Sequence, residues 1–186
     1  MQGEPRTTYV LVDGENIDAT LGTSILGRRP RPEERPRWER LLHFAQERWG
    51  HPATGLFFLA ANNDLPMPFV QALLAMGYRP VALTGAAGEK VVDIAIQRTL
   101  VELRRRDADV VLVSNDGDFV DEVADLLDGR HVGVVGFVEF RNLGFVALQD
   151  KGLECFDLEY DVQAFNERLP RVRIIPIDEF DPVQFL

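Results

Sequence analysis

Short runs of branched apolar residues alternate along the chain with segments in which apolar residues recur every three or four positions. The first pattern is typical of buried strands, and the second of helices that pack on a sheet. The apolar runs predict strands at residues 9–12, 55–61, 79–83, 110–113, 131–137 and 154–158. The helical spacing predicts helices at residues 38–49, 68–76, 89–106, 119–127 and 142–149. An Arg- and Pro-rich loop is expected from Gly22 to Pro36.

This alternation of strands and helices favours an α/β fold, a three-layer Rossmann-like sandwich with a mainly parallel central sheet. Ligands of such folds bind beyond the carboxyl ends of the strands. We expect one domain over residues 1–160. In residues 161–186, Pro170, Pro176 and Pro182 interrupt any long element, so we expect a tail that packs on the body or on a partner.

Acidic residues follow two of the predicted strands. Asp13 comes directly after the first strand, and Asp116 and Asp118 follow the fourth. Asp93 lies one turn into the long helix, among apolar neighbours, and faces the same crevice if the start of that helix does. Carboxylates that converge repel one another, and a bound divalent cation relieves the repulsion. Oxygen ligands without nearby His or Cys favour Mg²⁺ or Mn²⁺.

Other polar residues near these acids could take part in the same chemistry. A hard cation polarises a phosphoryl oxygen and lowers the pKa of bound water, which together describe phosphodiester hydrolysis. Asn16 and Ser114 could orient water or an acidic ligand, and Lys90 could pair with a phosphate or with the acids. The alternative is structural, because an Asp after a strand also serves as a helix cap or a turn residue.

Three segments that carry these residues resemble the acidic motifs of NYN domains, which are part of the PIN-like ribonuclease superfamily. The segments are residues 12–17, 90–94 and 113–119, in the order of the family, and the resemblance spans roughly residues 8–158. It implies a Rossmann-like PIN fold and metal-dependent endonuclease chemistry, usually on RNA. It also implies a set of site residues, with Asn16 a polar partner of the metal ligands Asp13, Asp93, Asp116 and Asp118.

One position departs from the family pattern. Many relatives carry a further Asp six residues after the helix Asp, where this chain has Thr99. The change leaves either a single strong metal site, with Glu15 as a candidate replacement, or a weak or silent catalyst.

Three functions therefore stay open. They are a metal-dependent endoribonuclease, a catalytically silent domain that binds RNA or protein, and a phosphatase of the haloacid-dehalogenase type. The phosphatase is poorly supported, because the second Asp of its motif would be Glu15 and the Thr expected after it is absent.

The formal net charge of −10 argues against a protein that coats nucleic acid through bulk electrostatics. A local basic surface can still exist on such a chain. Arg28, Arg29 and Arg31 could contact RNA phosphates, unless they belong to a solvated loop in which Glu33 and Glu34 offset their charge.

The single cysteine and the lack of an apolar run near twenty residues favour a cytoplasmic protein without membrane contact. We expect RNA as the partner. A homodimer through the Arg- and Pro-rich loop or residues 180–186 stays open.

Overall fold

The computed structural model of the protein describes residues 6–62 and 65–186. Six strands form one sheet in the order β3-β2-β1-β4-β5-β6, and every neighbouring pair is parallel. The strands are β1 (Thr7–Asp13), β2 (Ala53–Ala60), β3 (Arg79–Leu83), β4 (Ala108–Val113), β5 (Val132–Gly136) and β6 (Glu154–Asp157). All six strands lie where the apolar runs predict them.

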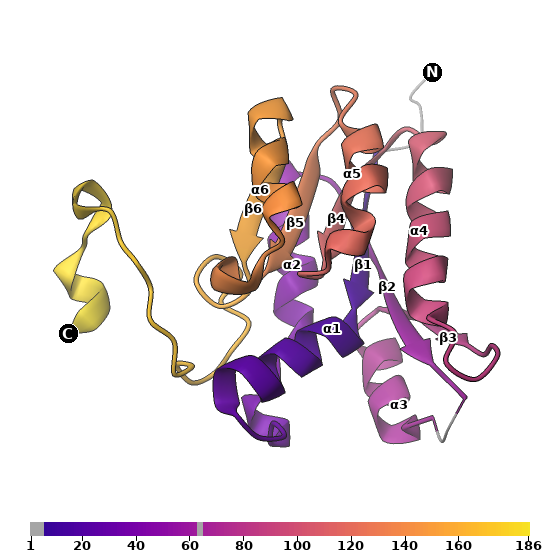
Figure 1. Ribbon diagram of the computed structural model, residues 1–186, viewed down its shortest axis with the longest axis horizontal. Coiled ribbons are helices and arrows are strands. Elements are labelled where there is room, and N and C mark those ends of the chain that lie inside the picture. The colour runs from indigo at the N-terminus through magenta and orange to yellow at the C-terminus, as the bar shows by residue number, and fades with distance from the viewer. Residues whose placement is uncertain (1–5, 63–64) are drawn as a thin grey trace.

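Helices cover both faces of this sheet, which confirms the predicted three-layer α/β sandwich. They are α1 (Gly14–Ala19), α2 (Trp38–Trp49), α3 (Met67–Ala75), α4 (Val91–Arg104), α5 (Val120–Leu126) and α6 (Leu143–Leu148). Figure 1 shows α4, α5 and α6 in front of the sheet and α2 behind it, with α1 and α3 near the carboxyl ends of the central strands.

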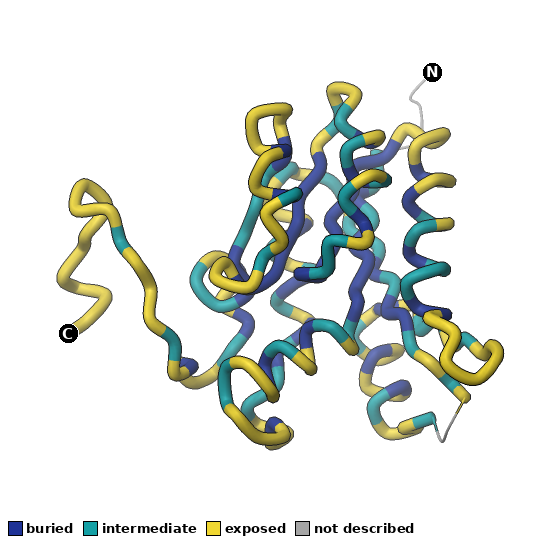
Figure 2. Tube along the Cα trace, in the orientation of Figure 1, coloured by how far each residue is buried: buried dark blue, intermediate teal, exposed yellow. Residues whose placement is uncertain are grey.

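The two-sided cover explains why the strands are apolar at successive positions. Side chains alternate between the two faces of a strand. In β1, Val10 and Val12 join the core beneath α2, whereas Leu11 joins the core beneath α4. Every residue of β4 is buried, and Figure 2 shows the central strands as the buried centre of the molecule.

The segment after β1 differs from the sequence prediction. Residues 22–26 of the expected loop are helical, because α1 continues directly into a π-helical segment, Thr20–Leu26. Ile17 and Leu21 lie four residues apart on this segment and are both fully buried, so they anchor one face of it to the core. The helical segment ends at Gly27, whose φ of 71° suits glycine.

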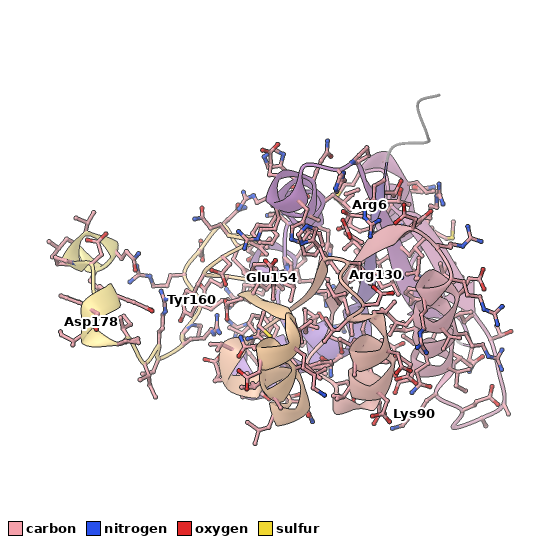
Figure 3. All side chains as sticks on the ribbon, turned by 90° about the horizontal axis from the view of Figure 1, so that it is seen from above. Arg6, Lys90, Arg130, Glu154, Tyr160 and Asp178 are labelled. Carbon is pink, nitrogen blue, oxygen red and sulfur yellow. The ribbon has the colours of Figure 1, made fainter. Side chains whose placement is uncertain are left out.

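The chain after β6 first packs on the body and then leaves it. Val162, Ala164 and Leu169 are buried, and the side chain of Arg171 is only 1% exposed. Residues 172–186 then project from the body and are mostly exposed (Figures 1 and 2). Figure 3 shows Tyr160 near the base of this projection and Asp178 on it. A domain boundary near residue 160 stays a prediction.

The strand order fixes where a ligand can bind. The sheet grows outward from β1 in both directions, so β1 and β4 form the switch point at which the connections turn to opposite faces. A crevice therefore opens beyond the carboxyl ends of these two strands. No helix in the described part of the chain is both long enough and apolar enough to cross a membrane.

Candidate metal centre

Three carboxylates meet at this switch point. Asp13 is the last residue of β1, Asp93 lies in the first turn of α4, and Asp116 follows β4. One oxygen atom from each side chain lies within 4.8 Å of the other two. We call these residues the acidic triad. Their convergence, expected from the sequence, depends on α4 beginning at the same edge of the sheet where β1 and β4 end.

Asp13 is the most buried member of the triad, with 2% of its surface exposed. Its Oδ2 accepts a 2.9 Å hydrogen bond from the Ser114 hydroxyl, and its Oδ1 accepts a 3.4 Å hydrogen bond from the backbone N–H of Asn16. Burial raises the pKa of Asp13 to about 6, although both hydrogen bonds act in the opposite direction. The charges of Asp93 and Asp116 contribute to the same rise, after burial.

Asp93 is less buried, and its surroundings also disfavour its charged form. Burial raises the pKa of Asp93, and the neighbouring carboxylates of Asp116 and Asp118 add to the effect, whereas Lys90 opposes it. Within residues 6–62 and 65–186, no Arg or Lys side chain forms an ion pair with the triad. A set of oxygen donors without a protein cation fits a bound divalent metal ion.

A hydrogen-bond network holds the loop after β4 in place. The Ser114 hydroxyl accepts a 3.1 Å hydrogen bond from the Asp116 N–H. The Asn115 N–H donates to Oδ1 of Asn16 at 2.8 Å, and Oδ1 of Asn115 accepts from the Phe137 N–H at 2.9 Å. Asn16 and Ser114 therefore tie the segment of Asp13 to the segment of Asp116.

Sequence reasoning assigned no role to Asn115, although it lies within the third acidic motif. Its side chain reaches the end of β5, where a Cβ on Gly136 would lie 2.2 Å from Oδ1 of Asn115. A polar residue at the end of a strand is too common a signal to have revealed this contact.

Asp118 and Lys90 lie beside the triad. The Asp118 N–H donates a 2.9 Å hydrogen bond to Oδ1 of Asp116, so Asp116 also caps the short 3₁₀ turn Gly117–Phe119. The Asp118 carboxylate lies 3.8 Å from the Lys90 ammonium group, and both side chains are well exposed. Metal binding by Asp118 and phosphate binding by Lys90 stay predictions.

The triad lines an open cleft of about 420 Å³ at the edge of the sheet. Glu15 and Lys90 also line this cleft. Thr99 does not line the cleft, and its hydroxyl donates a 2.7 Å hydrogen bond to the Ala95 carbonyl oxygen one turn earlier in α4. Thr99 therefore does not supply a ligand in place of the Asp that the family pattern has at this position.

The arginines predicted to bind substrate lie elsewhere. Arg28 and Arg29 line a separate hollow at the end of the helical segment, and none of Arg28, Arg29 and Arg31 lines the acidic cleft. The Arg28 guanidinium forms a 2.6 Å ion pair with Glu34, as the alternative of a partly neutralised loop expects. The backbone N–H of Arg31 donates to the same carboxylate at 2.8 Å. A phosphate-binding role of these arginines stays a prediction.

Comparisons with known proteins agree with this fold. No curated protein matches the sequence. A crystal structure of a protein of unknown function from Vibrio parahaemolyticus is similar, with a TM-score of 0.64 over 87% of this chain and 98% of that one, at 20% identity. The family model of the NYN domain matches residues 7–151, which include all three members of the acidic triad. Because this match spans most of the chain, the protein belongs to the NYN domain family.

Proposed function

We propose that this protein is a metal-dependent endoribonuclease, which hydrolyses phosphodiester bonds of RNA in the acidic cleft with bound Mg²⁺ or Mn²⁺. The observation that carries the proposal is the convergence of Asp13, Asp93 and Asp116 within 4.8 Å at the switch point of the sheet. Membership of the NYN family supports the same chemistry.

Bound divalent ions would supply a Lewis acid for a phosphoryl oxygen and lower the pKa of the attacking water. The chain's own residues hold the ligand set ready for that chemistry. Ser114 and the Asn16 N–H fix both carboxylate oxygens of Asp13, so this side chain is oriented before a ligand arrives. Asn16 acts as a polar partner in the site.

Asp118 and Lys90 complete the proposed site at the exposed side of the triad. Asp118 is a fourth candidate metal ligand, and Lys90, which lines the cleft, would pair its ammonium group with an RNA phosphate. The carboxylates repel an RNA phosphate unless a cation intervenes, so we expect RNA cleavage to depend strictly on added metal.

Two other functions, a silent RNA-binding domain and a phosphatase, are alternatives to the nuclease. A silent RNA-binding domain is favoured by Thr99, whose hydroxyl bonds to its own helix instead of supplying a carboxylate. A phosphatase would use Asp13 as its nucleophile, yet both oxygens of this buried carboxylate accept hydrogen bonds. Family membership also favours the nuclease over the phosphatase.

The test is an incubation of the purified protein with labelled single-stranded and structured RNA, in Mg²⁺, Mn²⁺ or EDTA. We expect internal cuts that disappear with EDTA and in Asp13→Asn and Asp93→Asn. Asp150→Asn is the matched control, because Asp150 is exposed just before β6, at the opposite end of the strands.

The outcomes separate the three functions. Intact RNA together with hydrolysis of small phosphomonoesters would favour the phosphatase. Intact RNA that binds to the protein, without hydrolysis of either substrate, would favour the silent domain.

A further inference from the structure

A second cavity, of about 440 Å³, lies next to the acidic cleft on the α2 side of the sheet. Its walls come from α1, residues 32–37, the start of α2, the end of β2, and α3. We call it the aromatic hollow; its apolar lining includes Ile17, Trp38, Phe57, Leu59, Phe69 and Met76. Figure 1 shows α1 and α3, which carry two of its walls, near the carboxyl ends of β1 and β2.

The hollow and the acidic cleft meet at the first turn of α1. Glu15 lines both cavities. Gly14 lines the hollow and directly follows Asp13 of the triad in the chain. A ligand held by the triad therefore needs to extend past only one helical turn to enter the hollow.

The aromatic wall is fixed before any ligand binds. Phe57 is only 2% exposed, and its ring packs edge to face against Trp38 and Phe69, with centroids 5.2 and 5.3 Å away, and against Tyr78 at 6.0 Å. Gly14 is required beside this ring, because a Cβ there would lie 2.6 Å from the Phe57 Cε1 atom. A preformed wall lowers the entropic cost of binding a flat ligand.

The polar groups of the hollow narrow the class of ligand. The charged residues Glu15, Asp18, Arg35, Arg37 and Glu39 also line the hollow, and the Arg35 guanidinium forms a 3.4 Å ion pair with Asp18. A nucleobase has flat apolar faces and an edge of hydrogen-bond donors and acceptors, which suits carboxylates and guanidinium groups together. A purely aliphatic ligand would form no hydrogen bonds with these groups.

We propose that the aromatic hollow receives one unstacked nucleobase of the RNA whose phosphate lies at the acidic triad. This inference rests on the proposed nuclease function and adds a base-binding subsite to it. The argument for RNA as the occupant is that the hollow and the acidic cleft share Glu15 in their linings, together with the polar groups that match the edge of a base.

The test compares a short unstructured fluorescein-labelled RNA with the same sugar-phosphate chain lacking all bases. Binding to the non-cleaving Asp93→Asn protein is followed by fluorescence anisotropy in Mg²⁺. We expect the intact RNA to bind about 5- to 150-fold more tightly, the range that corresponds to stacking of one base on aromatic side chains. Phe69→Ala should reduce the ratio of the affinity for the intact RNA to the affinity for the chain without bases.

A second variant avoids loss of core packing. Ala72→Leu, also on the Asp93→Asn background, adds a branched side chain at an exposed α3 position that lines the hollow, and should lower the ratio toward one. Ala75→Leu is the matched control, because Ala75 is exposed on the same helix but does not line the hollow, and its ratio should stay unchanged. Thermal melting checks that each variant is folded.

The readout separates failure of the subsite from failure of the nuclease. Equal affinity for the two chains, no binding of either chain, or an unchanged ratio in Ala72→Leu would overturn the base-binding subsite, even if the wild-type protein cuts RNA. A base-dependent ratio that Ala72→Leu removes would support the subsite, even if the wild-type protein cuts nothing.

Discussion

The Ser114 hydroxyl donates a 2.9 Å hydrogen bond to Oδ2 of Asp13 and so joins the carboxyl ends of β1 and β4. The same hydroxyl oxygen accepts the N–H of Asp116 at 3.1 Å. Ser114 has no exposed surface. One buried hydroxyl therefore sets the spacing between two members of the acidic triad.

Ser114→Ala should weaken metal binding. The change removes the hydrogen bond that orients Asp13 and favours its charged form, and loss of such outer contacts typically lowers metal affinity about 10- to 100-fold. Titration calorimetry with Mn²⁺ measures the effect, and Ser24→Ala is the control because Ser24 is exposed in the helical segment after α1. An unchanged Mn²⁺ affinity would show that Ser114 has no part in the centre.

Asp116→Asn should stabilise the metal-free protein. The amide oxygen of Asn can still accept the N–H of residue 118, so the cap is kept while repulsion within the triad falls. A decrease of about 1 kcal/mol in this repulsion corresponds to a rise in melting temperature of about 2 to 4 °C for a domain of this size. Differential scanning calorimetry in EDTA measures it.

Asp116→Ala separates the two effects, because it removes the repulsion and the cap together. Its melting temperature should lie below that of Asp116→Asn. A clear fall for Asp116→Asn itself would contradict strong repulsion in the triad. Excess Mg²⁺ should stabilise the wild-type protein more than either variant, because bound ligand adds to folding stability.

Arg171→Met should cost roughly 3 to 5 kcal/mol of unfolding free energy at pH 7, as removal of one partner from a buried ion pair does. The Arg171 guanidinium, 1% exposed, bonds to Asp157 at 2.6 Å and Glu159 at 3.1 Å, and also pairs with Glu139. Its Cζ lies 4.5 Å from the centre of the Tyr160 ring. Urea unfolding measures the change, and Arg173→Met, on an exposed neighbour, should change stability far less.

The cost of Arg171→Met should shrink in acid. Burial raises the pKa of Asp157, but Arg171 and the N–H groups of Tyr160 and Val138 outweigh it, so this pKa lies below its ordinary value. A depressed pKa contributes stability above the unfolded value of about 3.9, and that stability is lost as the pH falls through the folded value. A variant whose stability loss is equal at pH 7 and pH 3 would argue against this linkage.

Deletion of residues 174–186 should leave the unfolding free energy within about 1 kcal/mol of the full chain. Ile174 and Ile177 are 93% and 82% exposed, so their removal uncovers little of the core. The retained Arg171 keeps the preceding segment attached to the body. Urea unfolding of the truncated protein measures the difference, and a loss of several kcal/mol would mean that the projecting segment supports the fold.

Much of the fold could be predicted from the sequence because its signals are local. An apolar run such as residues 110–113 suits a strand covered on both faces, and Gly77 and Gly129 mark where helices give way to the next strand. The sequence predicts a loop at residues 22–26, which are helical in the structure, because this short segment has too few apolar positions to show a helical period. Ile17 and Leu21 stabilise it only through the core that they help to fill.

The sequence by itself determined the order of strands and helices and placed acidic residues after β1 and β4. Only the tertiary structure decided which of them converge. Asp116 and Asp118 are two residues apart, yet Asp116 joins the triad while the Asp118 carboxylate lies 3.8 Å from Lys90. The aromatic hollow and the Arg171 network are likewise set by three-dimensional packing. The physical reason is that side-chain direction depends on the sheet order and the phase of each helix, and spacing along the chain specifies neither.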